Sequence, residues 1–109
     1  MTYNMYLDDI RNPKTSRDWC VVRSFDEATK MMLSFGIPEY ISFDHDLGEA
    51  DERTGYDLAK WIVEQDMDGK LSIPDVFEFN VHSANSVGTA NITSYLESYI
   101  NQGQSDERT

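Results

Sequence analysis

The sequence predicts a small, doubly wound α/β domain with a mainly parallel sheet flanked by helices. Short apolar runs that suit strands alternate with segments whose apolar residues recur at helical spacing. Strands that alternate with helices pair in parallel through right-handed crossovers. The 109 residues suit one domain with one core. We expect this domain to span residues 1–101, followed by a disordered polar tail over residues 102–109.

The first half of the chain is expected to form two strands and one helix. The strands cover residues 5–7 and 19–23, and the connection over residues 9–18 is too irregular for a full helix. Ser24, with a glutamate three residues later, has the capping-box pattern that starts a helix. Gly36 then marks the end of this helix. The helical spacing of its apolar residues involves Ala28, Met31, Met32 and Phe35.

The second half repeats this alternation of strands and helices. Strands are expected over residues 40–43 and 76–81, and Thr54 with Asp57 gives a second capping box. The helix after Thr54 is expected to bury Leu58, Ala59, Ile62 and Val63. The final helix carries an apolar stripe of Ile92, Tyr95, Leu96, Tyr99 and Ile100.

The composition narrows the classes of partner. A net charge of −11 argues against affinity for duplex nucleic acid, which needs clustered Lys and Arg, and suits contact with a basic protein. No apolar run approaches the length of a membrane span, and the N-terminal residues lack the features of a signal peptide. The single cysteine, Cys20, permits no disulfide within the chain. We therefore expect a cytoplasmic protein without membrane contact, monomeric because the exposed faces show no apolar seam.

Three polar segments follow the expected strands, and they are the strongest functional signal in the sequence. They cover residues 7–11, 42–48 and 80–85 and contain both histidines of the chain. Ligands of open α/β sheets bind beyond the carboxyl ends of the strands, so these segments are expected to meet at one edge. Such a concentration of charge is costly unless a cation or a phosphate is bound there.

The acidic residues of these segments are candidate metal ligands. Asp8, Asp9 and Asp44 offer carboxylate oxygens, which suit Mg²⁺ or Mn²⁺. Asp46 is a candidate fourth ligand or catalytic group. The alternative for the first pair is a solvated turn. The alternative for the later acids is an acidic loop that continues through residues 49–52.

The other polar residues suit phosphate chemistry. His45 and His82 can give or take a proton near neutral pH, although a lone histidine is often a satisfied core residue. Ser83 is a candidate ligand for a phosphate oxygen, and Asn85 can offer a hydrogen bond beside the N-terminus of the last helix. Arg11 can pair with a phosphate or with one of the many acids. Arg53 is a second basic candidate.

These residues together resemble the response-regulator receiver domain, which has a flavodoxin-like fold, and more specifically the cyclic-phosphate processing receiver domain family. The resemblance rests on residues 7–13, 42–48, 54–57 and 80–85, with Gly88, Asn91 and Ile92. It implies a metal bound by Asp8, Asp9 and Asp44 and attack on a cyclic phosphate in the context of RNA repair. The chain departs from ordinary receivers in lacking a clear fifth strand and the lysine at its end and in adding two histidines, which favours hydrolysis over signalling.

Three hypotheses follow. The first is a metal-dependent phosphoesterase for a 2′,3′-cyclic nucleotide or RNA end, with one histidine as base and the other as acid, and with Arg11 and Ser83 on the phosphate oxygens. The second is a signalling switch with Asp44 as phosphoacceptor, in which the histidines are dispensable. The third is a non-enzymatic acidic module that binds a basic protein, in which the cluster tolerates Asn substitution.

Overall fold

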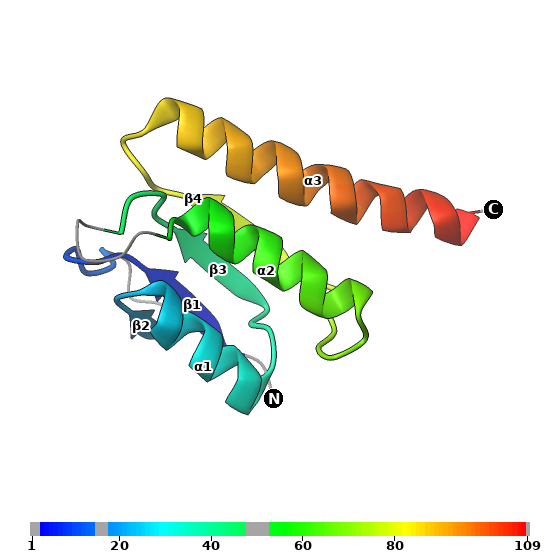
Figure 1. The fold of residues 1–109 in the computed structure, drawn as a ribbon, viewed down its shortest axis with the longest axis horizontal. Coiled ribbons are helices and arrows are strands. Elements are labelled where there is room, and N and C mark those ends of the chain that lie inside the picture. Colours follow the sequence, from blue (N-terminus) through cyan, green and yellow to red (C-terminus); the bar gives the residue numbers. More distant parts are fainter. Residues whose placement is uncertain (1–2, 15–17, 48–52, 109) are drawn as a thin grey trace.

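The computed structural model describes residues 3–14, 18–47 and 53–108 and confirms an α/β fold with parallel strands (Figure 1). The strands are hydrogen-bonded in the order β2-β1-β3-β4. The elements in chain order are β1 (Asn4–Leu7), β2 (Trp19–Val22), α1 (Phe25–Phe35), β3 (Tyr40–Phe43), α2 (Gly55–Met67), β4 (Glu78–Val81) and α3 (Ser86–Arg108). No helix among the described residues combines the length and apolar content that a membrane span needs.

The starts of α1 and α2 follow the capping signals in the sequence. The Ser24 hydroxyl accepts a hydrogen bond from the Glu27 N–H at 3.1 Å. The Glu27 carboxylate accepts from the N–H of Arg23 at 2.6 Å, so the reciprocal half of this box is displaced by one residue. At α2, Thr54 and Asp57 form both halves of the box. These contacts satisfy N–H groups that a helix start leaves unpaired, which fixes where each helix begins.

One apolar core joins the sheet to all three helices, which lie on one side of it (Figure 1). The predicted face of α2 is buried as expected. Phe35 of α1 is instead 67% exposed and packs edge-to-face on Tyr3, because helical spacing gives a stripe wider than the sheet can cover. The buried core residues of the strands are Met5, Leu7, Val22, Ile41 and Phe43, and those of the helices are Ala28, Met32, Leu58, Ala59, Ile62, Val63, Ile92 and Leu96.

The other face of the sheet carries rows of aromatic and polar side chains. Residues paired in register point to the same side, and successive residues of a strand point to opposite sides. The pairing aligns one row of Trp19, Asn4, Tyr40 and Glu78, and a second row of Val21, Tyr6, Ser42 and Asn80. No helix of the described part covers this face, since the connection between β1 and β2 is non-helical over residues 8–14 and at residue 18, as its sequence predicted.

The C-terminal half differs from expectation in two places. β4 begins at Glu78, two residues later than the apolar run suggested. α3 continues to Arg108, whereas a disordered tail was expected from residue 102. The tail contains no proline, and an established helix propagates at little cost through residues such as Gln and Glu.

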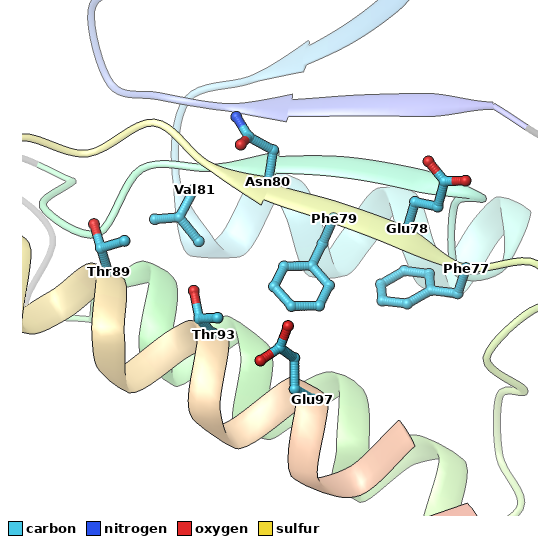
Figure 2. A pocket seen from close by; sticks show the side chains of 8 residues that line it. All are labelled: Phe77, Glu78, Phe79, Asn80, Val81, Thr89, Thr93 and Glu97. Carbon is cyan, nitrogen blue, oxygen red and sulfur yellow. The ribbon is translucent and has the colours of Figure 1, made fainter. Parts of the chain in front are cut away.

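β4 forms one edge of the sheet, because no fifth strand lies among the described residues, as the sequence predicted. A groove of about 460 Å³ runs between β4 and α3, with Phe77 and Phe79 on one side and Thr93 and Glu97 on the other (Figure 2). Asn80 points away from α3, consistent with the alternation of side chains along β4 (Figure 2).

Candidate metal and phosphate site

The site is the next row of the same sheet face, one residue beyond the strands. The parallel ladder continues there: the N–H of Asp8 donates to Val22 O at 3.2 Å, that of Asp44 to Leu7 O at 2.9 Å, and that of His82 to Phe43 O at 2.9 Å. Each of these three residues therefore lies on the face that carries the residue two positions earlier. The topology brings together two predicted acids and one predicted histidine.

Asp8 is the most heavily bonded residue of the site and is fully buried. Its Oδ1 accepts from the N–H groups of Ile10 and Arg11 at 2.9 and 2.8 Å. Its Oδ2 lies 2.8 Å from Arg11 Nε and 3.0 Å from His82 Nε2. Burial favours the protonated acid, but the two backbone hydrogen bonds, the His82 contact and the Arg11 charge outweigh it and lower the pKa of Asp8. The site therefore favours the charged form of Asp8.

Asp44 has the opposite balance. It is buried, its Oδ1 lies 3.5 Å from Arg11 Nη2, and its carboxylate is hydrogen-bonded by Ser83. Burial and the negative charge of Asp8 raise the pKa of Asp44, although Arg11, His82 and Ser83 oppose the shift. The negative charge on Asp44 is therefore the one that a bound cation would relieve.

The acids fit a divalent cation. Ligand oxygens of Asp8, Asp9 and Asp44 all lie within 4.8 Å of one another, and Asp9 is only partly buried. Mg²⁺ prefers oxygen ligands and usually keeps several waters, so a cluster with one open side suits it. The predicted set of three metal ligands is brought together, and the site resembles a receiver-type magnesium site.

His82 is bonded through both ring nitrogens. Its Nδ1 lies 2.7 Å from the Ser42 hydroxyl, its Nε2 contacts Asp8, and its ring stacks on Tyr6 with a centroid separation of 4.5 Å. In this arrangement Nε2 carries the proton that faces the carboxylate. His82 therefore orients Asp8, and both of its ring nitrogens are engaged within the protein.

Two arginines organise the loop after β1. Arg11, half exposed, bridges Asp8 and Asp44. The ion-pair alternative is therefore realised, and half of the side-chain surface of Arg11 remains accessible. Arg23 donates to the carbonyl oxygens of Asp8 and Arg11 at 3.3 and 2.6 Å and to Asn12 Oδ1 at 2.5 Å. Arg53 lies elsewhere, paired with Asp26 of α1 at 2.8 Å.

Ser83 and Asn85 have local roles at the start of α3. Ser83 Oγ, besides its contact with Asp44, accepts from the Asn85 N–H at 3.1 Å. Asn85 Oδ1 accepts from the Gly88 N–H at 2.9 Å, which is the contact of an N-cap. Ser83 thus belongs to the acidic site, whereas the side-chain oxygen of Asn85, a predicted substrate ligand, is used to start the helix.

His45 and Asp46 form a separate pair on the other side of β3. His45 follows Asp44 by one residue, so it faces the helices, where its Nδ1 lies 2.8 Å from Asp46 Oδ1. A Cβ on Gly88 would lie only 2.3 Å from His45 Cγ, which shows how closely the ring packs against α3. The expected pairing of the two histidines as acid and base at one point is not what this geometry favours. Asp46 is 65% exposed.

Three residues of this site were not predicted from the sequence: Tyr6, Ser42 and Arg23. A signal for the first two was available, because Tyr6 precedes Asp8 by two residues and Ser42 precedes Asp44 by two, which places each pair on one face. Arg23 had no such signal, since its contacts depend on the path of the loop after β1.

Comparison with known proteins identifies one family. The family described as Cyclic-phosphate processing Receiver domain matches residues 3–98. That match covers the four strands, α1, α2 and most of α3, and includes every residue of the site. Neither the curated proteins nor the solved structures gave a match.

Proposed function

Because the chain belongs to the cyclic-phosphate processing receiver domain family, we propose that it is a metal-dependent phosphoesterase that opens a 2′,3′-cyclic phosphate on a nucleotide or RNA end. One observation carries the proposal: three carboxylates, an arginine and a histidine converge at the strand ends. A bound Mg²⁺ or Mn²⁺ would polarise phosphoryl oxygens and lower the pKa of a coordinated water.

The reaction consumes one water. An oxygen–phosphorus bond forms, one ribose oxygen–phosphorus bond breaks, and the departing oxygen takes a proton, which leaves a phosphomonoester. Arg11 is suited to bind the phosphoryl oxygens because it lies at the acids and half of its side-chain surface is accessible. The Ser83 hydroxyl, which is hydrogen-bonded to Asp44, can donate to the same oxygens only in exchange for that contact. His82 is the better candidate for proton transfer, since His45 faces α3.

The partners we propose are a phosphate-bearing small molecule or an RNA terminus. The net charge of −11 disfavours a duplex, whose backbone would be repelled by most of the surface. A role in RNA repair, a cytoplasmic location and a monomeric state stay predictions from the sequence.

The direct test is hydrolysis of a 2′,3′-cyclic mononucleotide with and without Mg²⁺ and Mn²⁺. We expect metal-dependent turnover that is reduced at least a hundredfold in Asp44→Asn and in His82→Ala, given the usual size of general acid–base and electrostatic contributions. Asp68→Asn removes an exposed carboxylate at the far end of α2 and is the matched control, with turnover as in wild type. If the wild-type protein turns over the substrate equally fast in EDTA and in Mg²⁺, the metal-dependent mechanism is refuted.

A phosphoacceptor switch is the second candidate, favoured by the hydrogen bond between Asp44 and Ser83. It predicts that a small donor such as acetyl phosphate adds a phosphoryl group to Asp44, detectable by intact mass. Phosphorylation without hydrolysis would replace the phosphoesterase proposal. If neither hydrolysis nor phosphorylation of Asp44 is detected, and Mg²⁺ does not stabilise the protein, the acidic binding module is favoured.

A further inference from the structure

A pocket of about 530 Å³ lies next to the acidic site on the helix-free face of the sheet. It is lined by five residues of the two rows described above, namely Trp19 and Tyr40 of the first and Tyr6, Ser42 and Asn80 of the second, and by residues 11–14 of the loop after β1. Pockets for small organic ligands typically measure about 300–1,000 Å³. Its volume therefore suits a ligand of nucleotide size.

The pocket and the acidic site share two side chains. His82 lines the pocket with its ring on Tyr6 and touches Asp8 through Nε2. Arg11 lines the pocket and bridges Asp8 and Asp44. A ligand in the pocket would thus have one end at the acids.

The lining is rich in aromatic rings. The Trp19 ring lies 5.5 Å from the ring centroids of both Tyr6 and Tyr40, and all three residues line the pocket together with His82. Aromatic side chains on the face of a sheet are platforms on which nucleobases stack. The amide of Asn80 provides a hydrogen-bond donor and an acceptor on the same floor.

The charge of the pocket is opposite to that of the whole protein. Among the residues that the structure describes, its lining includes Arg11 and Lys14 and no carboxylate, in a chain with 20 acidic residues. The groove between β4 and α3, in contrast, has the carboxylate of Glu97 directed into it (Figure 2). The pocket therefore complements a ligand that is both aromatic and anionic.

We propose that this pocket binds the nucleoside part of the substrate, with the base against Trp19 and Tyr40 and the phosphate at Arg11. The inference rests on the proposed function, which identifies the group bound at the acids as the cyclic phosphate of the substrate. It adds that the enzyme requires a base attached to its cyclic phosphate, and it places base recognition on the helix-free face.

Binding without turnover provides the first test. Trp61→Phe leaves Trp19 as the one tryptophan, and its fluorescence is titrated with adenosine 3′-monophosphate and with ribose 5-phosphate in Mg²⁺. We expect the nucleotide to quench Trp19 and to bind at least tenfold more tightly than the base-free phosphate, the usual scale of base stacking. Equal affinity for the two ligands would overturn the inference.

Variants locate the site. Asn80→Ala changes an exposed side chain and should weaken nucleotide binding three- to tenfold, whereas its effect on ribose 5-phosphate should be less than twofold. Trp19→Ala should remove the preference for the nucleotide, measured by calorimetry after circular dichroism has established folding. Thr93→Ala, in the groove of Figure 2, is the control and should bind both ligands as wild type does. Nucleotide preference intact in Asn80→Ala and in a folded Trp19→Ala would overturn the assignment.

Hydrolysis separates this inference from the proposed function. Turnover of a cyclic mononucleotide is compared with that of glycerol 1,2-cyclic phosphate, which has no base. No turnover of either refutes the phosphoesterase, while the binding result still decides the pocket. Equal kcat/KM for both refutes the base-binding role and leaves the phosphoesterase in place.

Discussion

The contact between Gly88 and His45 gives a quantitative prediction about the junction of β3 and α3. A Cβ at position 88 would lie 2.3 Å from His45 Cγ, whereas carbon atoms meet at about 3.5–4.0 Å. Gly88→Ala must therefore move the imidazole by about 1 Å and disturb its 2.8 Å contact with Asp46. Overpacking of this kind lowers the free energy of unfolding by about 1–3 kcal/mol.

Removal of the His45 ring should reverse the sign of the effect that Gly88→Ala has on the free energy of unfolding. In a His45→Ala background the new methyl group has room, and alanine in place of glycine within a helix contributes up to about 1 kcal/mol. The coupling between the two substitutions should therefore reach about 1–4 kcal/mol, well above the ~0.5 kcal/mol scatter of independent sites. Urea denaturation of wild type, both single variants and the double variant measures it.

Gly55→Ala is the control for this cycle. A Cβ there would lie 2.1 Å from the Asp44 carbonyl oxygen, which is backbone and cannot rotate away. Gly55→Ala should destabilise the protein by more than Gly88→Ala, and His45→Ala should not rescue it. Additive effects of Gly88→Ala and His45→Ala would refute the packing of His45 against α3.

Four further predictions concern the site and the start of α2. Mg²⁺ at a hundred times its Kd should stabilise wild type by about 2.7 kcal/mol but leave Asp44→Asn unchanged. Thermal unfolding with Mg²⁺ and with EDTA measures this difference, and an equal rise in Tm in both proteins would exclude Asp44 as a ligand. Without metal, Asp44→Asn should be the more stable protein at pH 7 and equal to wild type at pH 3, because a raised pKa means that the charged form is the one destabilised by folding; a less stable variant at pH 7 contradicts the sign. His82→Phe keeps a ring on Tyr6 but leaves buried Asp8 without its Nε2 contact, so urea midpoints should fall by the equivalent of about 1–3 kcal/mol; an unchanged midpoint would show that the contact is not structural. Burial raises the pKa of Asp57, but hydrogen bonds from the Thr54 N–H and from Lys60 outweigh this effect and lower that pKa. The stabilisation that the charged Asp57 gives the protein is therefore complete above pH ~4 and is lost as the pH falls through the lowered value. The difference in free energy of unfolding between wild type and Asp57→Asn should close in acid, and a difference that persists at pH 2 counts against the capping box.

The sequence by itself determined the order of the elements and the edge at which the acids meet. Capping residues such as Thr54 act within a single turn, and strand alternation acts between neighbouring residues, so both can be read locally. The placement of Asp8 and Asp44 follows from parallel pairing alone, because the carboxyl ends of parallel strands share one edge. The same alternation already assigns His45 and Asp44 to opposite faces, a consequence that the expectation of a histidine pair did not take into account.

Only the tertiary structure decided what each face of the sheet contacts. The non-helical connection after β1 leaves one face without a helix, and residues 11–14 form a pocket wall there, so Tyr6, Ser42 and His82 become part of the site instead of the core. His45, on the covered face, packs against Gly88, which lies 43 residues later in the chain. Periodicity fixes the side of a strand on which a residue lies, but contacts between distant segments determine whether that side is core, pocket or solvent.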